Sequence, residues 1–381
     1  MIRVADILSA SIDEYLEHKG ISYKQGKVIS KIINCFSDNF LPVSFKCTNN
    51  DCTYQELKNR PCRDRHCNRC NQSKKIKWLI NVLKNYLPLP YFHVVFTLPS
   101  ELNNLAICNQ NIVYDIFFKS SFHVLNTFSK DKKRFGGSLG YIGLLHTWGS
   151  QLFYHPHIHY MVLCGGLKEG KFKKLPYSKK FLFPVKAMSK TMRGKFIDLL
   201  KENYSEAKLC FPGKLKDIST DKEFNMFLNK LGKKKWVIYS KAPFANGERT
   251  LEYISRYTHK VAISNSRIKS YEDGIVRFEY NDYRDKDKRG IPKKKILPIK
   301  DIEFTRRFLL HILPEGFRKI RYGGIFAPNK KRESIRIISE TIKSELRKLK
   351  EKVEVILYEL EEKVECICPF CKSKVLVSEY G

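Results

Sequence analysis

The sequence predicts an α+β protein in which an antiparallel sheet is flanked by helices. Residues 91–98 and 157–163 are short apolar runs of the kind that form buried strands. Residues 140–152 and 156–164 are joined by a turn sequence, which predicts an antiparallel hairpin. Residues 101–128 carry helical periodicity. With 381 residues, 43% of them hydrophobic, the chain is long enough for about two or three domains with buried cores.

The other elements follow in order along the chain. Two short amphipathic helices should come first, then a cysteine-rich module, then a basic helix that ends before Pro88 and Pro90. Further strands are expected at 236–240 and 275–280, and further helices at 247–263, 301–312 and 315–322. The predicted units are N-terminal helices (1–45), the cysteine-rich module (46–75), a sheet-bearing core (76–167 and 233–285), a Lys-rich helical insertion (168–232), a helical segment (286–329) and a C-terminal region (330–381).

The C-terminal region should begin with a long charged helix over 330–363 and end in a cysteine knuckle. Apolar residues recur along the helix at steps of four and three, as a heptad-like seam of Ile342, Leu346, Leu349, Val353, Ile356 and Leu360. We expect the seam to dock onto the protein's own core. The alternative is a homodimer formed through this helix.

The charge balance points to a polyanionic partner. Lys and Arg number 71 against 39 Asp and Glu, so the formal net charge is +32. Nucleic acid is the commonest partner of such a chain, and an anionic membrane surface is the rival. The positive residues run through the whole sequence rather than along one amphipathic helix, which favours nucleic acid. No apolar run approaches the roughly 20 residues of a membrane helix, and the first residues do not resemble a signal peptide. We therefore expect a cytoplasmic, nucleoid-associated protein and no membrane partner.

The cysteines predict a structural zinc site in the module 46–75. In a reducing compartment, paired cysteines suggest metal binding before disulfides. Cys47-x4-Cys52 and Cys67-x2-Cys70 supply two pairs of thiols, which is the set that a tetrahedral zinc ion needs. Cys62 and His66 lie between the pairs, and either could replace one ligand or help to hold a second ion.

Other cysteines lie outside this module. Cys366, Cys368 and Cys371 resemble half of a zinc ribbon, which needs a fourth ligand such as Cys62 or His66; a metal-free knuckle is the alternative. The isolated cysteines are expected to pack in apolar surroundings: Cys35, Cys108, Cys164 and Cys210.

A histidine cluster on the predicted hairpin indicates a second kind of metal site. His155, His157 and His159 alternate along one strand, so their imidazoles can point to one face. Converging imidazoles bind divalent metals. His146, on the other strand of the hairpin, is separated from His157 and His159 by odd numbers of positions, so it can share their face if the turn has a suitable length. Ser150 and Gln151 are weaker candidates for the third ligand.

Two tyrosines follow on a predicted helix. Tyr253 and Tyr257 are four residues apart, so they lie on one helical face. A phenol is a poor nucleophile at neutral pH. A bound divalent ion can polarise a phosphodiester, and basic neighbours favour the phenolate. Arg256 and Lys260 are the basic neighbours, and we expect them to contact DNA; a solvated basic face of the helix is the alternative.

With these motifs the chain resembles the rolling-circle transposases of the HUH class, in the two-tyrosine branch of the insertion-sequence ninety-one type. The resemblance covers most of the chain. It rests on ordered matches at 61–70, 96–99, 146–149, 155–159 with Gly165 and Gly166, 253–265, 282–285, 303–324, and Cys368 with Cys371.

The resemblance implies a ferredoxin-like antiparallel sheet with the histidine pair on a central strand. It also implies that Tyr253 or Tyr257 attacks single-stranded DNA at the ends of the element to form a 5′-phosphotyrosine link. His157 and His159 would hold Mg²⁺ or Mn²⁺ against the phosphate. The second tyrosine would attack a second strand and so complete the transfer.

Three other functions share some of these features. A rolling-circle replication initiator or relaxase would use the same chemistry, but the cysteine module and the 303–324 match favour the transposase. An inactive, zinc-stabilised DNA-binding regulator would have no use for the histidines and tyrosines. A small-molecule metal hydrolase would have no use for the net charge of +32.

Overall fold

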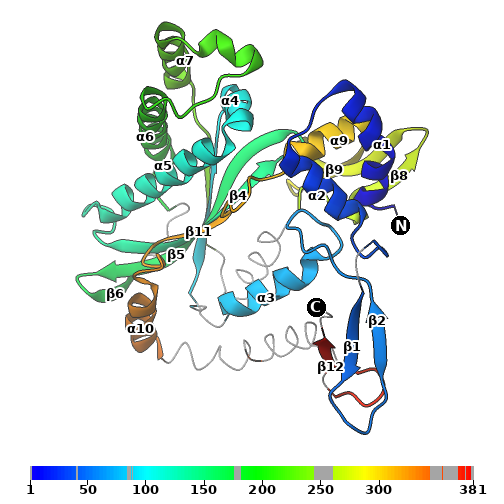
Figure 1. The fold of residues 1–381 in the computed structure, drawn as a ribbon. Helices are drawn as coiled ribbons and strands as arrows, with labels where there is room; N and C mark the ends of the chain where they lie inside the picture. Colours follow the sequence, from blue (N-terminus) through cyan, green and yellow to red (C-terminus); the bar gives the residue numbers. More distant parts are fainter. Residues whose placement is uncertain are drawn as a thin grey trace.

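The computed structural model describes residues 2–39, 42–83, 87, 89–175, 182–243, 261–343, 354, 368–373 and 375–378. It is an α+β structure of antiparallel sheets and flanking helices, as the sequence predicts (Figure 1). Within the described part of the chain, no helix is both long enough and apolar enough to cross a membrane.

The main sheet carries the elements expected from the apolar runs. Every neighbouring pair of its strands is antiparallel. Its order is β11 (Ile320–Gly324), β4 (Ser138–Trp148), β5 (Tyr154–Lys168), β3 (Tyr91–Thr97) and β7 (Ile238–Lys241), with β6 (Lys171–Lys174) also paired to β5.

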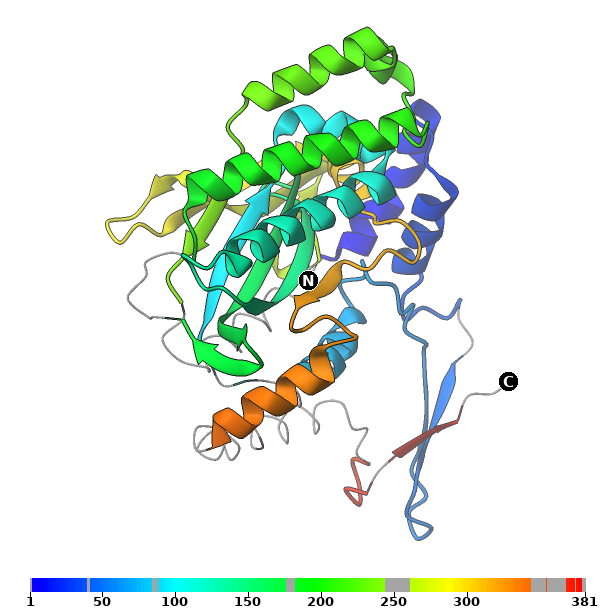
Figure 2. The ribbon, with the colours of Figure 1, turned by 90° about the vertical axis from the view of Figure 1, so that its left-hand side faces the viewer.

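One face of the main sheet is covered by helices. Alternate residues of β3 and β5, among them Phe96 and Tyr160, point into this core because side chains alternate across a strand. The helices are α4 (Asn103–Cys108), α5 (Gln110–Lys130), α6 (Val185–Ser205) and α7 (Asp221–Lys233), and Figure 2 shows α5 and α6 running side by side. Phe196 and Leu200 of α6 are fully buried in the same core. The Lys-rich segment 168–232 thus supplies α6 and α7, in line with the helical insertion that its sequence predicts, and both pack on the main core.

The other face of the main sheet is only partly covered. Helices α3 (Asn71–Leu83) and α10 (Lys331–Thr341) pack near one end of β5, where Leu79 and Ile338 join Met161 and Leu163 in a smaller core. Ile342, the first residue of the predicted seam, is buried in that core, as expected for docking. The rest of the seam lies outside the described residues.

A second sheet packs against the N-terminal helices. It has the order β10 (Pro292–Lys300), β9 (Ile275–Lys286) and β8 (Ile268–Glu272). Its buried face shares a core with α1 (Val4–His18), α2 (Tyr23–Ile33) and α9 (Asp301–Leu309). The strand expected at 275–280 is therefore real, but it belongs to this second sheet.

The prediction of a helix at 315–322 is wrong, because Ile320–Gly324 forms the edge strand β11 beside β4. Two glycines explain the difference. The ring of Tyr141 fills the space beside Gly323, and Gly324 has a φ of +60° with the carbonyl of Leu139 against it. This close approach of two backbones requires glycine and is incompatible with continuing a helix.

A third, small sheet joins the two ends of the chain. It has the order β12 (Val375–Ser378), β1 (Val43–Cys47) and β2 (Gln55–Lys58) (Figure 1). Short 3-10 turns complete the described structure at Ser100–Leu102, Gly213–Ile218 and Asn265–Arg267.

Candidate active site

Three histidines converge on the open face of the main sheet. His146 of β4 lies directly opposite His157 of β5, and His159 follows two residues later on the same face. The ring centroids of His159 are 4.8 Å from those of both His146 and His157. One ring nitrogen of each histidine lies within 4.8 Å of those of the other two. These three residues, which we call the histidine triad, are the set that the sequence predicts as metal ligands.

Hydrogen bonds orient two rings of the triad. Nδ1–H of His157 donates to the carbonyl oxygen of His155 at 2.7 Å, which leaves Nε2 with its lone pair. Nδ1 of His159 lies 3.0 Å from Nε2 of His93 on β3, and the two rings stack with 5.2 Å between centroids. A ligand histidine commonly donates its other N–H in this way, which fixes the tautomer and the ring orientation.

His93 is a site residue that the sequence analysis missed. It is 7% exposed, and burial lowers the pKa of its imidazole to about 4, so the ring is neutral at pH 7 and can accept a hydrogen bond. No local signal in the sequence marked it, because His93 reaches the side of His159 only through the pairing of β3 with β5.

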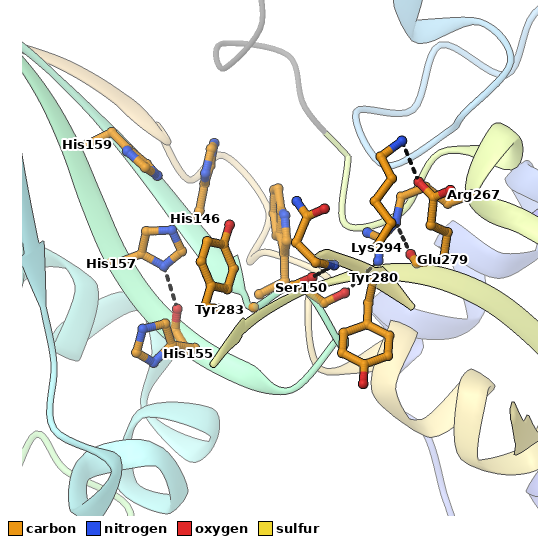
Figure 3. A pocket seen from close by; sticks show the side chains of 13 residues that line it. His146, Ser150, His155, His157, His159, Arg267, Glu279, Tyr280, Tyr283 and Lys294 are labelled. Atoms are coloured by element: carbon orange, nitrogen blue, oxygen red, sulfur yellow. Dashed lines mark hydrogen bonds and ion pairs between the residues drawn. The ribbon is translucent and has the colours of Figure 1, made fainter. Parts of the chain in front are cut away.

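The triad lines a cavity of about 490 Å³ between the main sheet and the second sheet (Figure 3). Trp148 stacks on His146 with ring centroids 4.7 Å apart and forms part of the wall. The second sheet and the turn before it line the opposite side, through Arg267, Glu279, Tyr280, Asn281, Tyr283 and Lys294. Tyr280 and Tyr283 are further lining residues that the sequence analysis did not identify.

Polar contacts tie the β4–β5 turn to the second sheet. Arg267 donates from Nε to the carbonyl of Glu279 at 2.8 Å and from a terminal nitrogen to the carbonyl of Ser150 at 2.5 Å. The backbone N–H of Asn281 donates to the Ser150 hydroxyl at 2.6 Å. The carbonyl of Gln151 accepts from Arg307 at 2.9 Å. The turn that carries Ser150 and Gln151 is therefore held by the second sheet and α9, and His146 takes the third place in the triad.

The charges that line the cavity favour an anion. Burial lowers the pKa of Arg267, yet a guanidinium remains charged at neutral pH. Lys294 pairs with Glu279 at 3.0 Å and holds the pKa of that carboxyl below its usual range. Among the described lining residues, two permanent cations thus face one carboxylate. A phosphate group would meet a net positive wall.

The predicted nucleophiles and their basic neighbours lie outside the described residues: Tyr253, Tyr257, Arg256 and Lys260. The description resumes at Val261. Val261 and Ala262 line a small pocket together with Trp148.

Eight of the described cysteines form two groups of four, and this corrects the predicted ligand pairing. Within each group the four Sγ atoms all lie within 4.8 Å of one another. The first group is Cys35, Cys62, Cys67 and Cys70; the second is Cys47, Cys52, Cys368 and Cys371. The prediction that combined Cys47 and Cys52 with Cys67 and Cys70 is wrong, because β1 and β2 carry the first pair away from the turn that holds the second.

Other cysteine predictions also change. Cys35 belongs to the first group rather than to general packing, and Cys62 is one of its four members. Cys108 and Cys210 are exposed, while Cys164 is buried as expected. The fourth partner expected for the terminal knuckle is neither Cys62 nor His66, since Cys368 and Cys371 meet Cys47 and Cys52. Cys366 lies outside the described residues.

His66 is a structural contact rather than a ligand. Its Nδ1 donates to the Asp64 carboxylate at 2.8 Å, and its Nε2 accepts from the backbone N–H of Leu313 at 3.1 Å. Burial lowers the pKa of His66, which keeps Nε2 available as an acceptor. His66 therefore joins the cysteine module to the segment after α9.

Comparison with known proteins assigns the chain to a family. Residues 140–334 match a family described as "Putative transposase", and residues 7–98 match one described as "Transposase zinc-binding domain". A relative from Sinorhizobium fredii (strain NBRC 101917 / NGR234), named "Putative transposase y4qJ", is 37% identical over 87% of this chain and 81% of its own length. The "Transposase for insertion sequence element IS801" of Pseudomonas savastanoi pv. phaseolicola is 29% identical over 82% of this chain and 72% of its own. No solved structure matches. The chain therefore belongs to the insertion-sequence transposases of the ninety-one type, with a zinc-binding module near its N-terminus.

Proposed function

We propose that this transposase nicks and joins single-stranded DNA at the ends of its insertion sequence by rolling-circle chemistry, with Tyr253 and Tyr257 as nucleophiles. The observation that carries the proposal is the convergence of His146, His157 and His159 in a cavity with a net positive wall. The position of Val261 adds support. It follows Tyr257 by four residues and lines a pocket with Trp148, whose ring stacks on His146.

The topology of the main sheet supports a ferredoxin-like nuclease core. Along the chain β3 is followed by helices, then by the hairpin β4–β5, then by helices and β7. In the sheet these strands lie in the order β4, β5, β3, β7. That is the β-α-β-β-α-β arrangement, and it puts His157 and His159 on a central strand.

The triad suits a divalent ion that also binds phosphate. Three neutral imidazoles would leave coordination positions open, and DNA oxygens and water would supply there the oxygen ligands that Mg²⁺ or Mn²⁺ prefers. A bound ion would polarise the phosphodiester and stabilise the negative charge that develops on it. His93 and the carbonyl of His155 would hold the ligand rings in place.

The chain's own part in the reaction is nucleophilic. The phenolate oxygen of one tyrosine attacks the phosphorus, and the bond to the 3′ oxygen breaks. The 3′ oxygen takes a proton and leaves as a hydroxyl, while the 5′ phosphate stays on the tyrosine. The reverse attack by a 3′ hydroxyl reseals the strand, and the second tyrosine can process another strand meanwhile. Arg267 and Lys294 would contact the backbone in the cavity, and Arg256 and Lys260 would contact it beside the nucleophiles.

The first cysteine group would hold a structural zinc ion. It lies wholly within residues 7–98, which match the zinc-binding domain. Four thiolates satisfy a closed tetrahedral site, so this zinc is structural rather than catalytic.

A nicking assay on single-stranded oligonucleotides from both ends of the element tests the proposal. We expect metal-dependent cleavage that leaves a free 3′ hydroxyl. The paired changes His157→Ala/His159→Ala and Tyr253→Phe/Tyr257→Phe should each abolish it while DNA binding persists. Tyr23→Phe is the control, because it removes an exposed phenol of α2 that does not line the cavity, and it should cleave normally. Cleavage that survives either paired change would refute the proposal.

A further inference from the structure

The second cysteine group is made by segments at opposite ends of the chain. Cys47 and Cys52 lie at the turn of the β1–β2 hairpin, and Cys368 and Cys371 lie in the knuckle before β12. Sγ of Cys47 is 3.3 Å from Sγ of Cys371, and Sγ of Cys52 is 3.6 Å from Sγ of Cys368. With a Zn–S bond of about 2.3 Å, ligand sulfurs at the corners of a tetrahedron are roughly 3.8 Å apart. The two shortest-range contacts lie slightly below that value, and all the sulfurs of the group lie within 4.8 Å of one another.

The backbone around these cysteines has the form of two metal-binding knuckles. In the first, the N–H of Asn49 points to Sγ of Cys47 at 3.4 Å, and the N–H of Cys52 donates to the carbonyl of Asn49 at 3.1 Å. In the second, the N–H of Lys372 donates to the carbonyl of Cys368 at 3.1 Å, and Lys372 has a φ of +61°. Tight turns of this kind bring two thiols of one short segment to the same side.

Strand pairing holds the two knuckles face to face. β12 runs antiparallel to β1, with Val375 opposite Cys47 and Ser378 opposite Ser44. The rings of Tyr54 and Phe370 also meet, with 5.7 Å between centroids. The four thiols are therefore brought together by backbone pairing that does not itself involve sulfur.

We propose that Cys47, Cys52, Cys368 and Cys371 bind a second structural zinc ion, which fastens the C-terminal segment to the N-terminal hairpin. The matched zinc-binding domain ends at residue 98, so it does not contain two of these ligands. Four thiols would lose their protons and leave a closed site with a net charge of −2. The contribution to stability is local. Without zinc the three-stranded sheet β12-β1-β2 loses the metal that links its strands, while the two larger sheets still have their buried apolar cores. This inference is independent of the proposed strand chemistry.

Zinc stoichiometry of the purified full-length protein tests the inference. Native mass spectrometry should find two zinc ions per chain. The change Cys368→Ser/Cys371→Ser should reduce the number to one. The matched control Cys108→Ser/Cys210→Ser removes two exposed cysteines that belong to neither group, and it should keep two. A zinc count that is the same in the Cys368→Ser/Cys371→Ser protein as in the unchanged protein would overturn the proposal, whatever the first cysteine group holds.

Proteolysis supplies a second readout that does not depend on counting metal. Trypsin should release the C-terminal segment at least tenfold faster from the Cys368→Ser/Cys371→Ser protein than from the control, with the same far-ultraviolet circular dichroism for both. Equal rates would contradict the clamp. Light scattering should find the same mass for both proteins. A dimer that becomes a monomer in the Cys368→Ser/Cys371→Ser protein would show that the site joins two chains, which also contradicts the proposal.

Discussion

Replacing His93 by phenylalanine tests how the histidine triad is held. His93 is buried, and its Nε2 lies 3.0 Å from Nδ1 of His159. If His159 binds metal through Nε2, its Nδ1 carries the proton and His93 must accept it. Phenylalanine keeps the stacked ring but removes the acceptor. Without this acceptor the N–H of His159 loses the partner that orients it, and the ring can turn or change tautomer.

The expected cost follows from comparable partners of ligand histidines. Loss of such a hydrogen bond weakens metal binding about 10- to 100-fold, or roughly 1.4–2.7 kcal/mol. We expect this loss for Mn²⁺ in His93→Phe, measured by calorimetry or by quenching of Trp148, which stacks on His146. His159→Ala should abolish the site.

The matched control is His123→Phe, the same change at an exposed histidine of α5, which covers the opposite face of the main sheet. It should leave Mn²⁺ affinity unchanged. If His93→Phe binds Mn²⁺ within a factor of two of the unchanged protein, while His159→Ala does not bind, then His93 does not position the site.

Two further predictions concern stability, and urea unfolding measures both. Burial lowers the pKa of His311 to about 4, so the folded state resists protonation of this imidazole while the unfolded chain does not. The free energy of unfolding therefore has its full value above about pH 6.5 and falls by about 2 kcal/mol between pH 7 and pH 5. His311→Gln should lose that dependence, and an equal slope in both proteins would contradict it. Gly324→Ala should destabilise by roughly 2–4 kcal/mol, since a Cβ would meet the Leu139 carbonyl at positive φ. Gly194→Ala, in open space on α6, should instead stabilise by about 0.5–1 kcal/mol, and a similar effect of both changes would refute the reasoning.

The central strands and the histidine triad could be predicted because their signals are local. The expected strands at 91–98, 140–152 and 157–163 correspond to β3, β4 and β5. Alternation along a strand, together with an odd offset across a hairpin, predicts that His146 can share the face of His157 and His159, and the register of β4 with β5 puts it there.

The cysteine pairing could not be predicted, because it depends on contacts between distant segments. Cys47 and Cys371 are separated by 324 positions, and spacing within a segment says nothing about which segments meet. The second sheet was largely missed for another reason. β10 carries two prolines and six exposed positions among its nine residues, so it lacks the apolar signal of a buried strand. Its position as an outer strand beside β9 depends on tertiary contacts, which the local sequence does not reveal.

The measurement that tests the central claim most directly is the identification of a covalent protein–DNA adduct. Single-stranded oligonucleotides from the element's ends would be incubated with the protein and Mg²⁺ or Mn²⁺, and the DNA-linked peptide would be sequenced by mass spectrometry. We predict a 5′-phosphotyrosine at Tyr253 or Tyr257 that disappears in EDTA and in His157→Ala/His159→Ala. Tight binding without an adduct, on both strands and both ends, would contradict the account, as would an adduct on another residue such as Tyr283.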